Sequence, residues 1–455
     1  MHVFDPLYGR IEIEADRLPI FRSRWFRRLH RLRQMGLCYL SFPGGNHTRY
    51  EHCLGTAHVA RMMALDAVDR SFLNEAEKRR LVSLVSVAAM CHDIGHGPFS
   101  HMTENALHGL GVRVTHEEVG GAIVRVHLQD ELSPLNAIGI TPHLVSSVFT
   151  HSNHNDPIAR AATTWVTSDL DADRIDYLNR DSYYTRAGGT LAFVPSELRG
   201  IWAVERVAGE VAAVLTEKGV RFAEKMLLLR RDNYRSIVYE SRHMAATGMF
   251  EKAVVEAVAH GGEFADLVAG AKSVDLDISG DDLEALERQL ESIWPIYGMA
   301  DSEALAMLTN SGANAQYLAK KLKRGDVFSS VARASWTSIH YAARERLLGI
   351  GPSSQAFSLR RSLERFIAER AEVDELHVLV SVGNARPPRP LMLPIIGGET
   401  LLDASPISRL LEADVLSDYA VECFVDPQAQ SAAPAVANAF KELFINGALI
   451  GVGHD

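Results

Sequence analysis

One short stretch of the chain concentrates side chains that can bind a metal ion. Residues 91–101 read CHDIGHGPFSH and place three imidazoles and one carboxylate within eleven positions. The apolar run Leu81–Met90 precedes them, so we expect the His92–Asp93 pair at the end of a buried helix that Gly95 and the Gly97–Pro98 step terminate. Because adjacent helical side chains diverge, the pair can share one ion only if distant residues complete the coordination shell.

Two other segments carry suitable residues. His52 lies in a helix that we expect to begin near Arg49, after the loop formers at 43–46. Residues 168–181 read SDLDADRIDYLNRD, and Asp169, Asp173 and Asp176 are spaced to share one helical face. Aspartate is a poor interior helix former, so this density favours a nearby cation or basic partner, with a solvated charged face as the alternative.

Together, His52, His92, Asp93 and Asp173 offer two imidazoles and two carboxylates. This set suits a divalent ion such as Mn, Fe, Mg, Zn or Co, and it lacks the thiolates of a structural zinc site. A metal held in this way polarises a phosphoryl oxygen. We therefore expect hydrolysis of a phosphoester or phosphoanhydride.

Basic residues gather in two places. Six arginines and His30 occupy residues 22–33, where either a solvated helix face or contact with a polyphosphate explains them. The sequence from Gly219 to about Met249 has a helical pattern. Two arginines and a tyrosine recur there every four residues, which predicts that their side chains line one stripe of the helix. They are Arg231, Arg235 and Tyr239.

Composition limits the function classes. The chain has 455 residues, of which 57 are acidic and 47 basic, and its net charge of -10 argues against general nucleic-acid binding while allowing a local pocket for a small polyanion. Neither an export signal at residues 1–5 nor an apolar run of about 18 residues is found, so we expect a cytoplasmic protein without a membrane partner. The four cysteines show no CxxC spacing and are interpreted as buried packing residues.

The remaining patterns predict a mainly α protein with short β-hairpins and a small C-terminal α+β appendage. We expect an N-terminal arm and basic helix over 1–48, a helical core over 49–350 and the appendage over 351–455. Hairpins are predicted within residues 1–20 and across Gly209 between Ile201 and Thr216, with further helices over 250–345. The appendage should contain strands at Leu376–Val382 and Tyr419–Val425 and helices near Ile407–Leu411 and at Ala433–Phe444.

The spacing of His52, His92–Asp93 and Asp173 resembles that of the HD-domain metal-dependent phosphohydrolases. The similarity extends to residues 46–55 (NHTRYEHCLG), 91–101 and 173–181. These blocks look like the deoxynucleoside triphosphate triphosphohydrolase branch, including the HD half of the vertebrate SAM- and HD-domain dNTPase and its bacterial relatives. The resemblance covers about Val3 to Val425 and implies the HD-type helical core.

The resemblance also implies roles for individual side chains. It assigns the metal to His52, His92, Asp93 and Asp173. Around the attacked phosphate it places His96, His101, Glu104 and His116, with His116 as general acid, His96 as a phosphate contact and Glu104 where an aspartate is usual. The triphosphate-binding positions are Arg49, Arg174, Tyr177 and Arg231. The positions lining the sugar and base are Gln34, Met35, Asp181 and Tyr239, and Arg235 stands where a histidine contacts the substrate.

The implied reaction is attack of water or hydroxide on the α-phosphorus, with release of the deoxynucleoside and inorganic tripolyphosphate. Relatives bind an activating guanine nucleotide near the N-terminal arm and assemble as dimers of dimers. Here the guanine-reading positions carry Arg22, Arg27 and His30, which argues for a basic anion site rather than a guanine-specific one. We therefore expect a homo-oligomer, dimer or tetramer, with a nucleotide effector at an N-terminal interface.

Two other hypotheses fit the same residues. The metal site could serve another nucleotide, such as a monophosphate, a cyclic nucleotide or an alarmone, and equal turnover of ATP and dATP would favour this. Alternatively, the chain is a catalytically silent nucleotide sensor. The complete ligand set and the presence of His101 and His116 argue against a sensor, because binding alone needs neither histidine.

Overall fold

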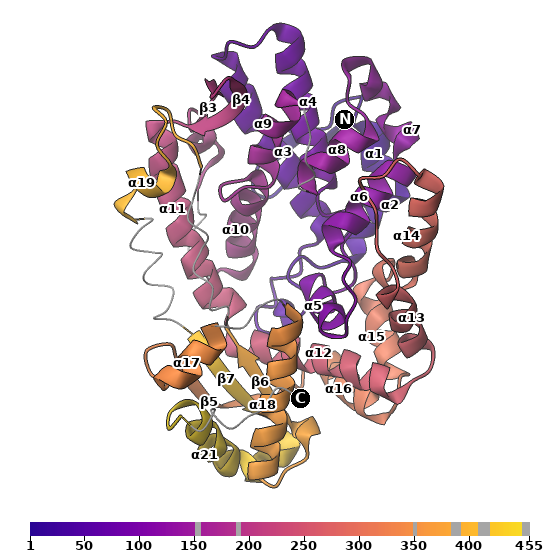
Figure 1. The fold of residues 1–455 in the computed structure, drawn as a ribbon, viewed down its shortest axis with the longest axis vertical. Helices are drawn as coiled ribbons and strands as arrows, with labels where there is room; N and C mark the ends of the chain where they lie inside the picture. The colour runs from indigo at the N-terminus through magenta and orange to yellow at the C-terminus, as the bar shows by residue number, and fades with distance from the viewer. Residues whose placement is uncertain (151–155, 188–192, 349–352, 384–392, 408–418, 448–455) are drawn as a thin grey trace.

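The computed structural model describes residues 1–150, 156–187, 193–348, 353–383, 393–407 and 419–447 (Figure 1). Within these ranges the protein is mainly helical and has three small sheets, as predicted. The four cysteines are unpaired and buried, which confirms their interpretation as packing residues. Among the described helices, none combines the length and the apolar character that crossing a bilayer requires.

The N-terminal arm forms the predicted hairpin, in which β1 (His2–Asp5) pairs with β2 (Gly9–Glu12). The expected basic helix is instead divided into α1 (Leu18–Arg22), α2 (Arg24–Arg27) and the 3₁₀ turn η1 (Arg28–Arg31). The division falls at Ser23, whose backbone is extended and whose hydroxyl accepts a hydrogen bond from the Phe26 amide at 3.2 Å. Ser23 therefore caps a new helix, as serine commonly does.

Two long helices form the centre of the molecule. Capping boxes begin both α3 (Arg49–Asp69), at Thr48, and α4 (Glu75–Cys91), at Asn74. The start of α3 at Arg49 is where the sequence predicts it. α3 and α4 pack against each other, and every residue of α4 from Leu81 onward is buried. Shorter helices around this pair are α5 (His101–Gly109), α6 (His116–His127), α7 (Gln129–Leu132), α8 (Pro142–Phe149) and α9 (Pro157–Val166).

Helix α10 (Ala172–Thr185) packs against α3 and brings the aspartate-rich segment to the centre. Asp171 is its N-cap, and its carboxylate accepts a hydrogen bond from the Arg174 amide at 2.7 Å. The predicted helical face is therefore too long, because Asp169 precedes the helix. Asp173 and Asp176 remain on α10.

The predicted hairpin across Gly209 is confirmed as β3 (Trp202–Val207) and β4 (Glu210–Leu215). The predicted helix from Gly219 to Met249 is interrupted: α11 (Glu217–Asn233) runs into a π turn, η5 (Tyr234–Val238), before α12 (Ser241–His260). The Tyr239 amide bonds to the Tyr234 carbonyl at 2.9 Å, the i→i+5 pattern of a π turn. Arg231, Arg235 and Tyr239 thus do not follow one regular α-helical stripe.

The expectation of helices alone over residues 250–345 is wrong at β5 (Ser329–Ser335). Its sequence, SSVARAS, has little intrinsic strand preference, and pairing with a distant strand stabilises it. The helices of this region are α13 (Glu263–Lys272), α14 (Leu283–Tyr297), α15 (Asp301–Thr309), α16 (Ala313–Arg324) and α17 (Tyr341–Leu348).

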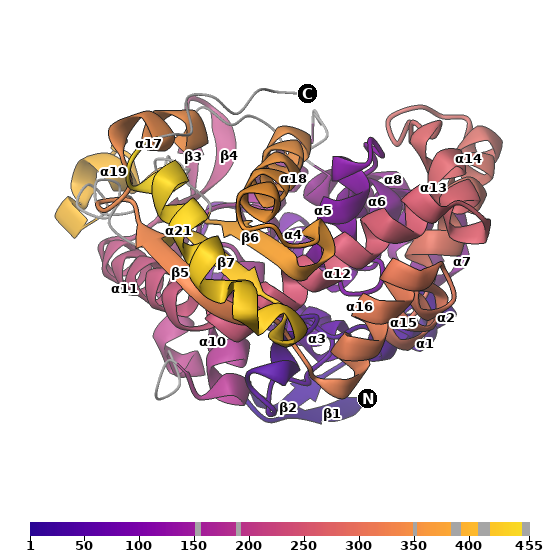
Figure 2. The same ribbon diagram turned by 90° about the horizontal axis from the view of Figure 1, so that it is seen from below.

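The C-terminal sheet has the order β5–β7–β6, with β6 (Val378–Val382) and β7 (Tyr419–Val425) where strands were predicted. Its apolar residues alternate between two cores. Leu379 and Phe424 belong to the main core beside α12, whereas Val378 and Val425 belong to a second core with α18 (Ser353–Arg370) and α21 (Ala433–Phe444). Figure 2 shows α21 crossing the sheet.

The second core also contains Trp336 and Ile339, which precede residue 350. The domain boundaries at 48 and 350 stay predictions. The helix expected at Ala433–Phe444 is confirmed, whereas 408–411 of the piece expected near Ile407–Leu411 lie outside the described residues. A short helix, α19 (Leu401–Ala404), lies just before that piece.

Candidate functional site

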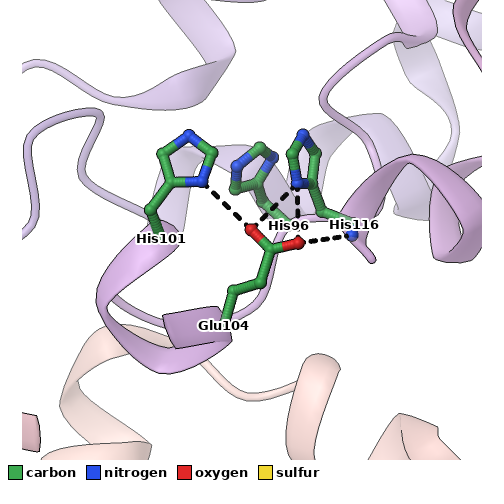
Figure 3. A group of neighbouring side chains, drawn as sticks. All are labelled: His96, His101, Glu104 and His116. Carbon is green, nitrogen blue, oxygen red and sulfur yellow. Dashed lines mark hydrogen bonds and ion pairs between the residues drawn. The ribbon is translucent and has the colours of Figure 1, made fainter. Parts of the chain in front are cut away.

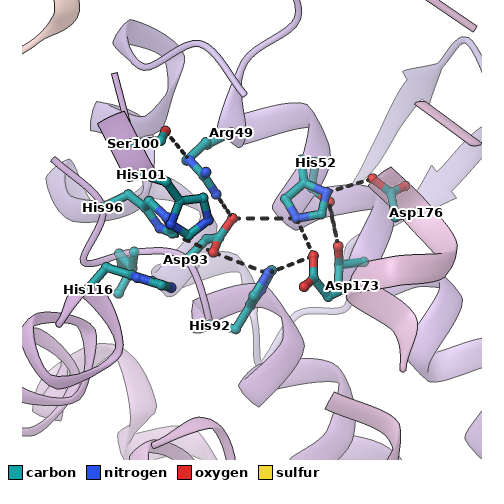
Figure 4. A network of polar contacts seen from close by, with 12 residues as sticks. Arg49, His52, His92, Asp93, His96, Ser100, His101, His116, Asp173 and Asp176 are labelled. Atoms are coloured by element: carbon teal, nitrogen blue, oxygen red, sulfur yellow. Dashed lines mark hydrogen bonds and ion pairs between the residues drawn. The ribbon is translucent and has the colours of Figure 1, made fainter. Parts of the chain in front are cut away.

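The structure brings together the four side chains expected to bind the metal (Figure 4). His52 extends from α3, His92 and Asp93 lie at the exit of α4, and Asp173 lies in the first turn of α10. His52 Nε2 is 3.0 Å from an Asp173 oxygen and 3.4 Å from an Asp93 oxygen, and His92 Nε2 lies 3.6 and 3.4 Å from the same two carboxylates. Ligand atoms bound to one ion at about 2 Å are themselves about 3 Å apart, so this spacing suits a single cation.

Hydrogen bonds on the far side of each ring define its tautomer. His92 Nδ1 lies 2.8 Å from the carbonyl oxygen of Ala89, and His52 Nδ1 lies 2.8 Å from a carboxylate oxygen of Asp176. Both partners can only accept, so both Nδ1 atoms carry the proton. The two buried Nε2 atoms make no hydrogen bond and present lone pairs toward the carboxylates.

The nitrogen lone pairs of the two histidines and the two carboxylates repel one another unless a positive charge lies between them. Burial lowers the pKa of His52, but its interactions with the Asp173 and Asp176 carboxylates outweigh burial and raise the pKa to about 10. A proton can therefore supply the charge, and a divalent ion competes with that proton for the same lone pair. The residues present fit a divalent metal.

The orientation of His52 is itself supported from the N-terminal hairpin. Arg180 donates to both oxygens of Asp176, at 2.8 and 3.0 Å, and also to Asp5 at 2.9 Å. Gly55 leaves the room that this pair needs, because a Cβ there would lie 2.1 Å from an Asp176 oxygen. The network is buried, since Arg180 and Asp176 have no solvent-exposed area and Asp5 is almost fully buried.

Asp93 also interacts with an arginine of α3. Arg49 forms an ion pair with Asp93 and donates from Nε to the Ser100 hydroxyl at 2.6 Å. Burial raises the pKa of Asp93, but the Arg49 guanidinium and the neighbouring histidines outweigh it and hold the pKa well below its usual range. Arg49 thus lies beside the candidate metal ligands.

A second cluster surrounds Glu104 (Figure 3). Its carboxylate accepts from His101 Nδ1 at 3.0 Å and from His116 Nδ1 at 3.1 Å, and also from the His116 amide at 3.0 Å. The glutamate standing where an aspartate is usual therefore reaches both histidines. The His96 ring lies 3.7 Å from the His116 ring, and its Nδ1 lies 3.2 Å from an Asp93 oxygen, so His96 bridges the two clusters.

The pKa values of His96, which is buried, and of His116, which is partly buried, are shifted in opposite directions. For His116, burial lowers the pKa, but hydrogen bonding and attraction to Glu104 raise it above the usual value. For His96, burial and the neighbouring Arg49 and His116 lower the pKa well below the usual value. Two neighbouring imidazoles with pKa values shifted in opposite directions are an arrangement suited to proton donation.

Among the predicted sugar and base positions, Gln34 and Asp181 are brought together by His47. The Gln34 amide bonds to the His47 carbonyl at 3.0 Å, and His47 Nε2 lies 2.9 Å from an Asp181 oxygen. Sequence reasoning gave His47 no role, although it lies in the block 46–55. Met35 lies beside Gln34 and accepts through its carbonyl from the Cys38 amide at 3.0 Å.

The other predicted substrate contacts lie on α10 and on the segment from α11 to η5, which packs against α10. The Arg174 guanidinium forms an ion pair with Asp171 and bonds to the Ser168 carbonyl. Tyr177 is partly buried and Arg235 is exposed. Contact of these residues, and of Arg231 and Tyr239, with a substrate stays a prediction.

The basic stretch has a structural component that the sequence did not reveal. Arg28 donates to the carbonyls of Ile94 and His96, at 2.9 and 2.7 Å, and to that of Tyr297 at 3.0 Å. By contrast, Arg22 and Arg27 are exposed, and His30 stacks on Tyr50 with 3.6 Å between ring centroids. The proposed effector site at these three positions stays a prediction.

Comparison with known proteins supports the same interpretation. Residues 49–180 match the model of the HD domain family. An uncharacterised protein of Methanocaldococcus jannaschii is 30% identical over 254 residues, which cover 56% of this chain and 49% of that protein. The human deoxynucleoside triphosphate triphosphohydrolase SAMHD1 is 36% identical over 141 residues, which cover 30% of this chain and 21% of that protein.

A crystal structure of a phosphohydrolase from Bacteroides thetaiotaomicron has a similar fold, with a TM-score of 0.63 and 20% identity, covering 94% of this chain and 99% of that one. The chain spans about half the length of the first curated relatives it matches. The matched segment contains all four candidate metal ligands and the Glu104 cluster. Residues 49–180 thus form an HD domain, and the chain resembles the HD-domain phosphohydrolases of the deoxynucleoside triphosphate triphosphohydrolase branch.

Proposed function

We propose that this protein is a metal-dependent hydrolase that converts deoxynucleoside triphosphates to deoxynucleosides and inorganic tripolyphosphate. One observation carries the proposal. The Nε2 lone pairs of His52 and His92 converge on Asp93 and Asp173, and His96 connects this centre to the pair Glu104–His116. Candidate metal ligands and an imidazole whose pKa is raised by Glu104 are thus adjacent, which suits metal-assisted hydrolysis of a phosphate ester with a general acid.

In this proposal His52, His92, Asp93 and Asp173 hold the divalent ion. When bound, the ion supplies Lewis-acid polarisation of the phosphoryl group and favours deprotonation of a water. Water adds to the α-phosphorus, and the bond from phosphorus to the 5′ oxygen breaks. Because Glu104 engages Nδ1 of His116, the Nε2 proton of His116 is the one available to the leaving 5′ oxygen.

Arginines are the proposed ligands of the triphosphate. Arg49 is buried beside the candidate metal ligands. Arg174 lies on α10 and Arg231 on α11. A triphosphate brings about four negative charges, and arginine forks bind such oxygens well. Arg49 and Arg174 are paired with Asp93 and Asp171 here, so substrate binding exchanges these partners for phosphate.

The test is a grid of divalent metals against the four dNTPs and four NTPs, with products identified by mass. The proposal expects unphosphorylated deoxynucleoside and tripolyphosphate, with dNTPs turned over faster than NTPs. Release of phosphate or pyrophosphate instead, or equal turnover of ATP and dATP, would move the assignment to another HD-type phosphohydrolase. Absence of product in every well would favour a nucleotide sensor.

The central variant is His92→Ala. We expect it to lose bound metal and to lower turnover to background, because the centre then has one imidazole and loses a buried ligand. His260→Ala, an exposed histidine in the last turn of α12, is the matched control and should keep both properties. Metal analysis of the purified proteins and product assays measure the two effects.

A further inference from the structure

The loop that carries the candidate catalytic histidines ends in an unusual turn. Phe99 and Ser100 have φ angles of 53° and 54°, although neither is a glycine. Residues with side chains rarely adopt this left-handed conformation unless their surroundings enforce it. The turn leads directly into α5, which begins at His101 and carries Glu104 in its first turn.

A buried carboxylate from a distant helix holds this turn. Asp301, the first residue of α15, accepts from the Phe99 amide at 2.8 Å through one oxygen and from the Arg33 amide at 3.0 Å through the other. Only 2% of Asp301 is exposed. Within the turn, the Ser100 hydroxyl accepts a hydrogen bond from Arg49, so the turn also positions the residue that pairs with Asp93.

Tyr297, four residues before Asp301, supports the partner loop. Its hydroxyl donates to the carbonyl of Val114 at 2.9 Å, two residues before His116. Its ring and backbone also lie against Gly97, where a Cβ would be 3.5 Å away. The segment 297–301 therefore contacts both loops that meet at the Glu104 cluster.

We propose that Asp301 and Tyr297 are positioning residues that hold the two histidine-bearing loops in register for proton transfer. This inference rests on the proposed function for its catalytic consequence. Asp301 sets the start of α5 and hence Glu104, and Tyr297 sets the start of α6 and hence His116. Neither side chain contacts the metal ligands directly, so their loss misplaces the proton donor while leaving the metal bound.

The experiment uses Asp301→Ala, Asp301→Asn and Tyr297→Phe in the full chain. Small displacements of reacting groups cost up to about 100-fold in rate. We expect kcat to fall about 10- to 100-fold in Asp301→Ala and less in the other two, with KM and metal content unchanged. Asn keeps an oxygen for the Phe99 amide, so Asp301→Asn should recover part of the loss and remains informative if the alanine variant does not fold.

Hydrogen exchange supplies a readout that does not depend on the substrate. Peptides covering 94–107 should exchange faster in Asp301→Ala, while those from α3 stay protected. Glu303→Gln is the matched control, because Glu303 lies on the same helix but pairs with Arg31 at the surface. If wild-type protein hydrolyses no dNTP, the proposed function fails, yet the exchange data still test the positioning role. Wild-type kcat and unchanged exchange in Asp301→Ala would overturn the inference.

Discussion

At the scale of single residues, the candidate centre depends on which nitrogen of His52 carries the proton. Asp176 accepts from Nδ1 and so leaves Nε2 as the ligand atom. Outer carboxylates of this kind orient metal-binding imidazoles and increase their basicity. Asp176 therefore acts on the metal through His52, although it is not itself among the expected ligands.

We predict that Asp176→Asn weakens metal binding by about 10- to 100-fold, because the amide can present its nitrogen to Nδ1 and favour the wrong tautomer. Turnover should recover at saturating metal, which separates this variant from His92→Ala. Metal titrations of activity and isothermal titration calorimetry measure the shift. An unchanged metal affinity would show that Asp176 serves only to neutralise Arg180. Thermal unfolding is measured alongside, because the variant leaves the buried Arg180 with Asp5 as its charged partner and should melt at a lower temperature.

A pH effect on stability follows from His243. Burial lowers its pKa to about 4, against the opposing influence of Glu240 and Asp181. The folded pKa lies below the unfolded value of about 6.5, so the unfolded chain binds the proton first as pH falls. His243 therefore does not affect the free energy of unfolding above about pH 7, and it lowers that free energy progressively as the pH falls from about 6.5 to about 4.

We therefore predict that wild type loses about 2 kcal/mol more stability than His243→Gln between pH 7.5 and pH 5. Urea unfolding followed by circular dichroism at each pH measures the free energy of unfolding for both proteins. The comparison is between pH slopes, since the substitution also changes stability at every pH. Parallel curves would contradict the prediction.

Some residues of the site could be predicted from the sequence and others could not. The convergence of the four candidate metal ligands was predictable because HD is a local pair and the spacing of His52 and Asp173 adds two more blocks. Asp301 and Tyr297 were not, because each is an ordinary residue in its own helix. Only the fold brings Asp301 to Phe99, a neighbour 202 positions away.

At the scale of elements, Gly95 shows how a correct prediction can rest on an incomplete reason. The sequence indicates a helix terminator after His92–Asp93. α4 ends slightly earlier, at Cys91, so that His92 is its C-cap and the pair lies just past the helix. The structure adds a stronger constraint, because a Cβ at Gly95 would lie 2.1 Å from the His116 carbonyl oxygen and 2.2 Å from the Gly120 amide. Gly95 therefore allows the HD loop to approach α6, and so His96 to reach His116.

We predict that Gly95→Ala separates the loop from α6, lowers stability by about 1–3 kcal/mol, as overpacking commonly does, and reduces turnover. Gly270→Ala in α13 is the matched control. Its Cβ would meet nothing within 4 Å, so the gain in helix propensity should stabilise the protein by up to about 1 kcal/mol. Thermal and urea unfolding measure both, and equal effects of the two substitutions would refute the close-approach argument.

Elements with local signals were predictable and those set by tertiary pairing were not. Thr48 and Asn74 mark the starts of α3 and α4 through their capping boxes, which are properties of four consecutive residues. β5 has no such signal and exists as a strand because β7 pairs with it. The π turn η5 was likewise missed, because its residues fit a continuous helical pattern equally well.

At the scale of the whole molecule, the C-terminal sheet joins two cores. One face of β6 and β7 contributes to the main core and the other to the core formed with α18 and α21. α18 also packs against α5, where the Phe357 ring lies so near Gly109 that a Cβ there would be 2.3 Å from it. The C-terminal part therefore contacts the helix that carries His101 and Glu104.

A buried ion pair crosses this junction. Lys252 of α12 lies 3.2 Å from Glu364 of α18 and donates to the carbonyl of Val378 at 2.8 Å, and both charged side chains are almost fully buried. Glu364 in turn accepts from the Val380 amide at 3.1 Å. Removing one member of such a pair typically costs about 3–5 kcal/mol. Without Lys252, Glu364 keeps only its ion pair with Arg361 at 3.1 Å among the described ion pairs, so we expect a cost at the low end of that range.

We predict that Lys252→Met lowers the free energy of unfolding by about 3 kcal/mol and makes the C-terminal part susceptible to proteolysis first, because α18 and β6 lose their shared anchor. Lys252→Met with Glu364→Gln should recover part of the loss, since the buried carboxylate that lost Lys252 is then neutral. Lys320→Met, at an exposed lysine of α16, is the matched control and should stay within about 0.5 kcal/mol of wild type. Urea unfolding with limited proteolysis measures these effects. Were Lys252→Met to unfold at the wild-type midpoint, the ion pair would not be what holds the two cores together, and the alternating apolar faces of β6 and β7 would have to suffice.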